Sequence, residues 1–139
     1  MNTEFQEVYD IFLSKITDFD YLSILESDLQ EELLQKLKSA YATFFGSDIK
    51  LDLDMETFNK ELEYIEKEIL AYGILYEWLS PTVFNIENTK QYINSSDWKT
   101  YSQAKHLDEL RLLLKDVEKK KDYLMKKYKL EKKKKELEG

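Results

Sequence analysis

Four acidic residues close together form the part of the sequence most like a cation-binding loop. Asp48, Asp52, Asp54 and Glu56 could supply the oxygen ligands that Ca²⁺ prefers. The segment lacks the glycine and the terminal glutamate of an EF-hand loop, and leucines occupy positions between the acids. A polar-edged strand or the approach to a helix accounts for the pattern better, so we expect no metal site here.

The single histidine and the glutamates on expected helices make no stronger case for chemistry. His106 has no nucleophile or acid around it in a recognised arrangement, so a packed or capping role is expected. Glu32, Glu68 and Glu77 have no Glu-x-x-His spacing that would complete a di-iron site. The absence of cysteine excludes thiolate metal sites and a cysteine nucleophile. We therefore expect a protein that is not an enzyme, with no catalytic residues, metal or cofactor.

Composition favours long helices with few connections. The chain has 139 residues, enough for one ordinary domain, and contains only 3 glycines and 1 proline. No apolar run approaches the length of a membrane span, and the first residues lack the basic and apolar regions of a signal peptide. We expect no membrane association and synthesis in a cytoplasm.

Apolar spacing predicts the all-α class, a bundle of about five helices with a long, protruding C-terminal helix. The expected helices cover about 4–17, a stretch from Ser27 to about Phe45, 63–79, 83–93 and 103–137. Thr3 and Gln6 have the spacing of a capping box for the first helix, and residues 49–54 alternate as in a short extended segment. Ser80 and Pro81 separate the third helix from the fourth. Gly73 lies inside the third helix at a cost of about 1 kcal/mol, so a neighbouring backbone is expected to approach it closely.

Charge divides the chain into an acidic body and a basic end. Residues 1–103 carry 8 lysines and 20 acids, a net charge of −12, whereas residues 104–139 carry 13 basic and 8 acidic residues, a net charge of +5. An acidic body is unsuited to binding nucleic acid, which requires a positive field. The lysines of the basic end, interleaved with glutamates, are typical of a solvated helix face.

The last helix carries a heptad seam with one lysine in it. Its members are Leu107, Leu110, Leu114, Val117, Lys121, Leu124 and Tyr128. Such a helix is about 50 Å long, while a compact chain of this size has a radius of gyration of about 14 Å, so its own domain cannot cover it fully. We divide the chain into a helical domain, 1–128, and a Lys-rich helical extension or tail, 129–139.

Two strings resemble small helical structural proteins of tailed bacteriophages that infect Gram-positive hosts. They are Gly-x-x-x-Glu-Trp-Leu-x-Pro, within 69–81, and Tyr-Ser-Gln-Ala, within 98–107. Residues 8–18 and residues 37–40 are also similar to this group, and the likeness extends to about Tyr128. Within this group the all-helical neck components are the head-tail adaptor, or connector, proteins. The resemblance implies a homo-oligomeric ring in the virion neck, usually of twelve copies, that links the portal protein to a tail-side neck protein while DNA passes through the lumen.

Aromatic residues in the loop before the last helix, and one side of that helix, are the candidate partner interface. The candidate residues are Trp98, Tyr101, Leu114, Val117, Leu124, Tyr128, Lys126, Lys127, Lys132, Lys133, Lys134 and Lys135. The alternative is a stand-alone helical regulatory or protein-binding module that self-associates through the C-terminal helix.

Overall fold

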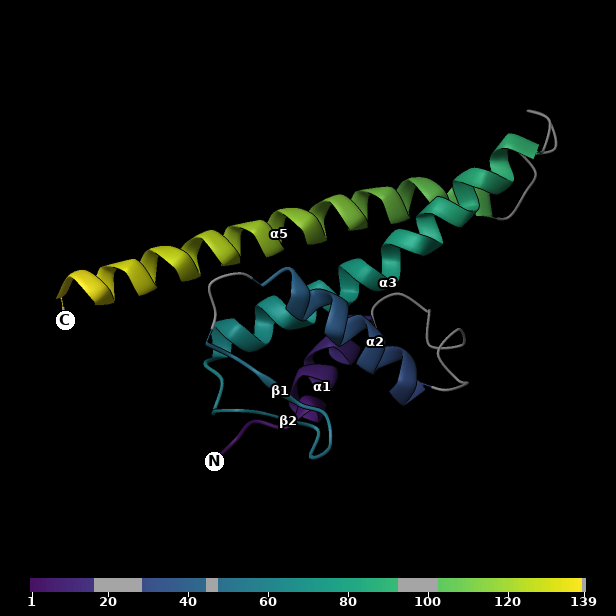
Figure 1. Cartoon of the computed structure of the whole chain (residues 1–139). Helices are drawn as coiled ribbons and strands as arrows, with labels where there is room; N and C mark the ends of the chain where they lie inside the picture. Colours follow the sequence, from purple (N-terminus) through teal and green to yellow (C-terminus); the bar gives the residue numbers. More distant parts are fainter. Residues whose placement is uncertain (17–28, 45–47, 93–102, 139) are drawn as a thin grey trace.

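The structure, a computed structural model, describes residues 1–16, 29–44, 48–92 and 103–138 (Figure 1). Its elements are α1 (Phe5–Ile16), α2 (Leu29–Ala42), β1 (Leu51–Asp52), β2 (Thr57–Phe58), α3 (Tyr64–Tyr92) and α5 (Gln103–Glu138). The all-α class and the long C-terminal helix are confirmed. The described residues form four helices, so the predicted number of about five is not confirmed. None of these four helices is both long and apolar enough to cross a membrane.

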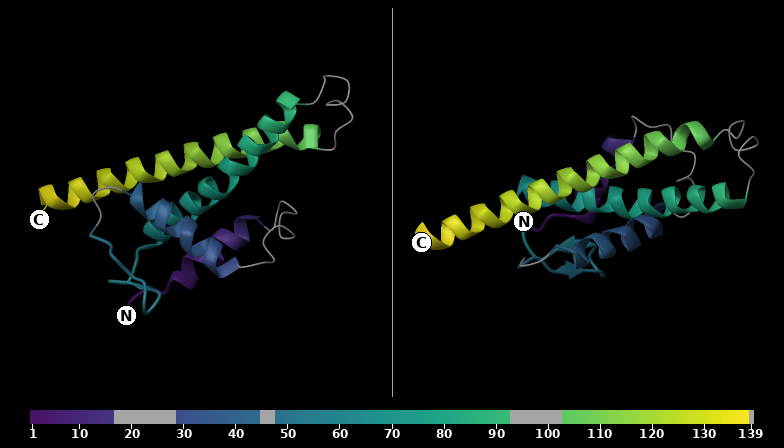
Figure 2. Two further views of the ribbon diagram at one scale, coloured as in Figure 1. Left: turned by 45° about the vertical axis from the view of Figure 1, so that its right-hand side comes forward. Right: turned by 90° about the horizontal axis from the view of Figure 1, so that it is seen from above.

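Helix α3 is the centre of the molecule because all the other described helices pack against it. Figures 1 and 2 show α1 and α2 on one side of α3 and α5 running along the other. The C-terminal end of α5 extends beyond the bundle. With 36 residues, α5 is about 54 Å long. The acidic body and the basic helix therefore occupy different parts of the molecule.

The N-terminal residues join the β-hairpin rather than capping α1 in the predicted way. The Thr3 hydroxyl accepts a hydrogen bond from the Leu62 backbone N–H at 2.8 Å, and the Phe58 backbone N–H donates to the Thr3 carbonyl at 2.8 Å. The predicted capping box between Thr3 and Gln6 is thus wrong. Glu7 instead accepts a hydrogen bond from the Glu4 backbone N–H at 3.2 Å, because Thr3 is engaged by a segment distant in sequence.

The expected extended segment at 49–54 is present only in part. Residues 51 and 52 form β1, which pairs antiparallel with β2, Leu51 opposite Phe58. The chain reverses at 53–56, where Glu56 adopts a left-handed backbone with φ of 55°. The alternation could not reveal the second strand, because Thr57 and Phe58 are too short a run to show a period.

The predicted close approach at Gly73 is confirmed. A Cβ placed on Gly73 would lie 2.6 Å from the Ala40 Cβ, well inside van der Waals contact. Helices α2 and α3 therefore cross at a pair of small residues, and the side chain that is missing from Gly73 allows their backbones to approach.

The predicted helix break at Pro81 is wrong. Helix α3 continues through Pro81 to Tyr92. A proline inside a helix costs about 3 kcal/mol, since it lacks an N–H and crowds the preceding turn. Pro81 itself is exposed, whereas Leu79 and Val83 on either side are buried in the core. Burial of this continuous apolar face compensates for the local penalty, so the predicted fourth helix is the second half of α3.

Candidate interaction surface

One face of α5 packs against its own bundle. Of the predicted seam, Leu110, Val117 and Tyr128 are buried and Leu114 and Leu124 are partly buried against the core. The Tyr128 ring also contacts the Phe44 ring edge-on, with centroids 5.2 Å apart. Val117 and Tyr128, predicted as partner contacts, are therefore occupied within the chain. Leu114 and Leu124 keep some exposed surface.

A buried carboxylate links α5 to the start of α3. The Glu66 side chain is 0% exposed and its Oε2 accepts a hydrogen bond from the Tyr128 hydroxyl at 2.7 Å. The other oxygen, Oε1, accepts from the Glu63 backbone N–H at 2.8 Å, as in half of a capping box. The Lys60 ammonium lies 3.2 Å from Oε2. Glu66 thus links the C-terminal half of α5, the start of α3 and the segment that precedes α3.

The same lysine extends the network to the surface. Lys60 also pairs with Asp48 at 3.1 Å, and Lys132 of α5 approaches the same Asp48 oxygen at 3.4 Å. The hydrogen bond from Lys60 holds the pKa of the Asp48 carboxyl below its ordinary value. Lys60 keeps a raised pKa because its two carboxylate partners outweigh its burial. Sequence reasoning missed this network, although Glu63-x-x-Glu66 carries the spacing of a helix N-terminus.

Buried tyrosines predict a loss of stability at alkaline pH. Burial, and then the nearby Glu56 carboxylate, raise the pKa of Tyr9 to about 12; burial and the hydrogen bond to Glu66 also raise the pKa of Tyr128. Both exceed the ordinary value of 10.0, so the unfolded chain releases these protons first. The stability that the two protonated tyrosines contribute to the folded protein is complete below pH 10 and is lost as the pH rises through their folded-state pKa values. We expect Tyr9 alone to contribute a loss of about 3 kcal/mol.

Urea denaturation at a series of pH values from neutrality to the alkaline range measures this effect. The Tyr9→Phe variant should lose stability less steeply than the parent above pH 10. An equal slope in the two proteins would contradict the assignment.

The opposite face of α5 carries a second apolar stripe. Leu112, Tyr123, Leu130 and Leu137 are 64 to 81% exposed and follow one another at spacings of 11, 7 and 7 residues. At about 100° per residue these positions fall within an arc of about 40°. We call them the outer stripe. Its spacings of 11 and 7 residues are wider than the steps of three and four that mark the buried seam, so the sequence pattern did not indicate it.

The predicted lysines divide between the two faces of α5. Lys126, Lys127, Lys133 and Lys134 are exposed and lie three or four residues from Leu130, which places them beside the outer stripe. Lys132 faces the body and reaches Asp48, and its ammonium lies 5.0 Å from the Tyr128 ring centroid. The predicted Lys135 lies 3.9 Å from Glu63, also on the body side. The four lysines beside Leu130 are thus the part of the predicted set best placed for a partner.

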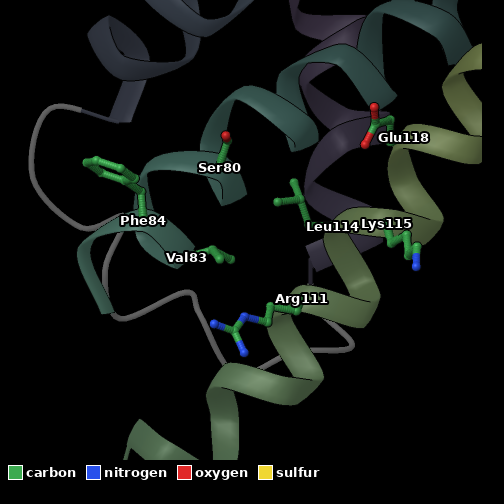
Figure 3. A pocket seen from close by; sticks show the side chains of 7 residues that line it. All are labelled: Ser80, Val83, Phe84, Arg111, Leu114, Lys115 and Glu118. Carbon is green, nitrogen blue, oxygen red and sulfur yellow. The ribbon is translucent and has the colours of Figure 1, made fainter. Parts of the chain in front are cut away.

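A hollow of about 430 Å³ separates α5 from the second half of α3 (Figure 3). Val83 and Leu114 give it apolar surface, Arg111 and Lys115 bring positive charge from α5, and Phe84 projects from α3. Phe84 is 62% exposed. Among the described residues, neither histidine nor paired carboxylates line this hollow. Its chemistry suits contact with another surface.

The remaining candidate positions do not form a site among the described residues. These residues contain no group of three or more potential metal ligands, so Asp48, Asp52, Asp54 and Glu56 do not converge. Asp52 instead accepts a hydrogen bond from the Met55 backbone N–H at 3.1 Å. The backbone of His106 belongs to α5, but its side chain lies outside the described residues, as do Trp98 and Tyr101.

Fold and surfaces together define a small helical-bundle protein with a long helix that presents a basic, partly apolar outer face. Comparison with known proteins found no match: no family model fits the chain, and no curated protein or solved structure is significantly similar to it.

Proposed function

We propose that this chain is a structural subunit of a tailed-bacteriophage neck. In this proposal it is a head-tail adaptor that forms a ring beneath the portal and links the capsid to the tail. It acts as a scaffold and channel wall and catalyses no reaction. The proposal rests on the resemblance of 69–81 and 98–107 to phage adaptor proteins and on the arrangement of α5.

The observation that carries the proposal is the use of both faces of α5. The inner face is anchored through Leu110, Val117 and Tyr128, while the outer stripe is exposed from Leu112 to Leu137, about 38 Å of helix. An anchored helix with a free face can dock on a partner without leaving its own bundle. This arrangement suits a subunit that joins two other proteins.

The chemistry of the outer face favours an acidic partner. Four lysines flank Leu130, so a partner that covers this leucine must also accommodate their charge. We propose that the portal supplies an acidic surface here and that the tail-side neck protein binds elsewhere on the ring. The acidic body would give a ring a negative lumen, which lets DNA pass without adhering.

The alternative, a regulatory module that dimerises through the C-terminal seam, is less well supported. Its proposed contact surface includes Leu110, Val117 and Tyr128, which are buried within the chain. Dimerisation through these residues would first have to separate α5 from α3.

Deletion of residues 129–139 tests the proposal. We expect the truncated protein to lose at least about tenfold in affinity for the portal protein of the same phage, since Leu130, Leu137 and their lysines are removed. Co-purification after co-expression measures this. Unchanged co-assembly would reject the proposal.

Two double variants separate docking from folding. Leu130→Asp with Leu137→Asp changes only the outer stripe and should reproduce the loss. Lys132→Ala with Lys135→Ala changes the body-facing lysines and should retain portal binding, since exposed ion pairs stabilise by about 1 kcal/mol or less. Equal binding by both double variants would show that the outer stripe is not the docking surface.

A further inference from the structure

We propose that the chain binds a second copy of itself, with the tip of the β-hairpin of one copy inserted into a tyrosine-lined groove between α3 and α5 of the next. The tip consists of residues 52–56. The groove is lined by Tyr64, Glu68, Tyr72, Lys120, Tyr123 and Leu124. This inference rests on the proposed function, because it supplies the contact between neighbouring subunits that a ring requires.

The hairpin tip is a rigid projection with unused apolar side chains. Leu53 is 50% and Met55 71% exposed, although large apolar residues in the rest of the hairpin are better covered. The turn is held by the hydrogen bond from the Met55 N–H to Asp52. Its base is held by Phe58, which is fully buried, and by the Phe5 N–H, which donates to the Glu56 carbonyl at 2.9 Å. Insertion of such a tip costs little conformational entropy.

The groove is also preorganised. It has a volume of about 260 Å³, and Tyr64 and Tyr123 on its two walls are 73% and 64% exposed. Lys15 lies 4.2 Å from the Tyr72 ring centroid and pairs with Glu68 at 2.9 Å, which fixes the floor between α1 and α3. Exposed tyrosines around an apolar recess are typical of residues that anchor protein interfaces.

Charge complementarity selects the hairpin as the occupant. The tip carries Asp52, Asp54 and Glu56 and no basic residue. The α5 segment that forms one wall, residues 119–127, carries five lysines and a single acid, Asp122. Two α5 helices would repel each other at these lysines. The tip instead brings apolar and acidic groups together to an aromatic groove beside this lysine-rich wall; the groove lining itself carries Lys120 and Glu68, and Glu68 is paired with Lys15.

The hairpin tip is poorly placed to enter the groove of its own chain. In Figure 1 the hairpin extends from the side of the bundle opposite α5. Contact between two different surfaces is heterologous, so a bound pair of copies leaves one tip and one groove free, and a suitable rotation closes the series into a ring. In that ring Tyr123 would meet the neighbouring subunit, leaving Leu130 and Leu137 for the portal.

Disulfide trapping tests the contact directly, because the chain contains no cysteine. Full-length Met55→Cys and Tyr64→Cys variants are mixed under mild oxidation at high protein concentration. We expect the mixture to form a disulfide-linked dimer and each variant alone to form little. No dimer in the mixture, or equal dimer formation by each variant alone, would overturn the proposal.

Mixing of two blocked variants gives a second, independent readout. Leu53→Asp with Met55→Asp disables the tip, and Lys120→Glu with Tyr123→Ser disables the groove. Each should weaken self-association at least about tenfold in sedimentation velocity, while the mixture should form heterodimers that grow no further. Phe84→Ser, an equally exposed aromatic position outside the groove, should leave association unchanged. Loss of association by Phe84→Ser alone would assign the contact to another surface.

These experiments use the chain without portal protein. Failure of self-association would overturn this inference and leave portal docking through Leu130 and Leu137 intact. Failure of portal docking with intact trapping would reject the adaptor proposal and retain the contact between copies.

Discussion

Replacement of Glu66 by alanine should lower the free energy of unfolding by about 3–5 kcal/mol. The substitution removes the acceptor for the buried Tyr128 hydroxyl, the Glu63 backbone N–H and one of the two carboxylates of Lys60. Buried donors that lose their acceptor retain the full desolvation cost. The loss should be measurable by urea denaturation followed by circular dichroism.

Glu63→Ala is the matched control for this prediction. Glu63 is the same residue type only three positions away, but its side chain is half exposed and lies 3.9 Å from Lys135. We expect a loss of less than about 1 kcal/mol there. Similar losses in the two variants would show that the burial of Glu66 does not determine its contribution to the free energy of unfolding.

The Glu66→Ala substitution should also weaken the packing of α5 against α3. Because Tyr128 joins the C-terminal half of α5 to Glu66, Glu66→Ala should increase tryptic cleavage at the lysines of that half under native conditions. Tyr128→Phe removes only the hydroxyl and should give a smaller loss, about 1–3 kcal/mol, with the same increase in cleavage. Unchanged cleavage in both variants would show that the hydrogen bond between Tyr128 and Glu66 does not hold α5 against α3.

Replacement of Gly73 by alanine should lower the free energy of unfolding by about 1–3 kcal/mol, contrary to intrinsic helix propensity. Alanine is better than glycine inside a helix by about 1 kcal/mol. At Gly73, however, the added Cβ would lie 2.6 Å from the Ala40 Cβ. Both atoms are attached directly to helix backbones, so relief requires α2 and α3 to move apart. Thermal or urea denaturation gives the sign of the effect.

A compensating pair tests whether the helix crossing is the cause. Ala40→Gly in the Gly73→Ala background removes the opposing Cβ and should recover most of the loss. Ala40→Gly alone should cost about 1 kcal/mol through helix propensity. A double variant no more stable than Gly73→Ala would contradict the proposed clash.

Gly73 and Glu66 fix the relative positions of the helices that carry the proposed surfaces. Gly73 sets how closely α2 approaches α3, and Glu66 sets how α5 lies along α3. The outer stripe and the tyrosine groove depend on α5 keeping this position. Loss of the Glu66 contact should therefore weaken portal docking and self-association together. Leu130→Asp with Leu137→Asp should weaken only portal docking, and Leu53→Asp with Met55→Asp should weaken only self-association.

Periodicity predicted most of the helices but could not assign their partners. The series through Leu110, Val117 and Tyr128 has the spacing of an apolar seam, and this spacing is the same whether the series meets α3 of its own chain or another copy. The outer stripe has comparable spacing and remains exposed. Only the direction in which the chain folds back from α3 to α5 determines which stripe is covered.

Sequence patterns alone predict the helical class, the long last helix, the close approach at Gly73 and the separation of an acidic body from a basic end. These features depend on composition and on spacings within one helix, which local rules describe. Packing between distant segments sets the course of α3 through Pro81, the hydrogen bonds of Thr3, the burial of Glu66 and the face of α5 that stays exposed. Each of these depends on groups distant in the chain: Thr3 meets Leu62, and Glu66 meets Tyr128. Packing against such partners contributes more free energy than the local preferences it overrides.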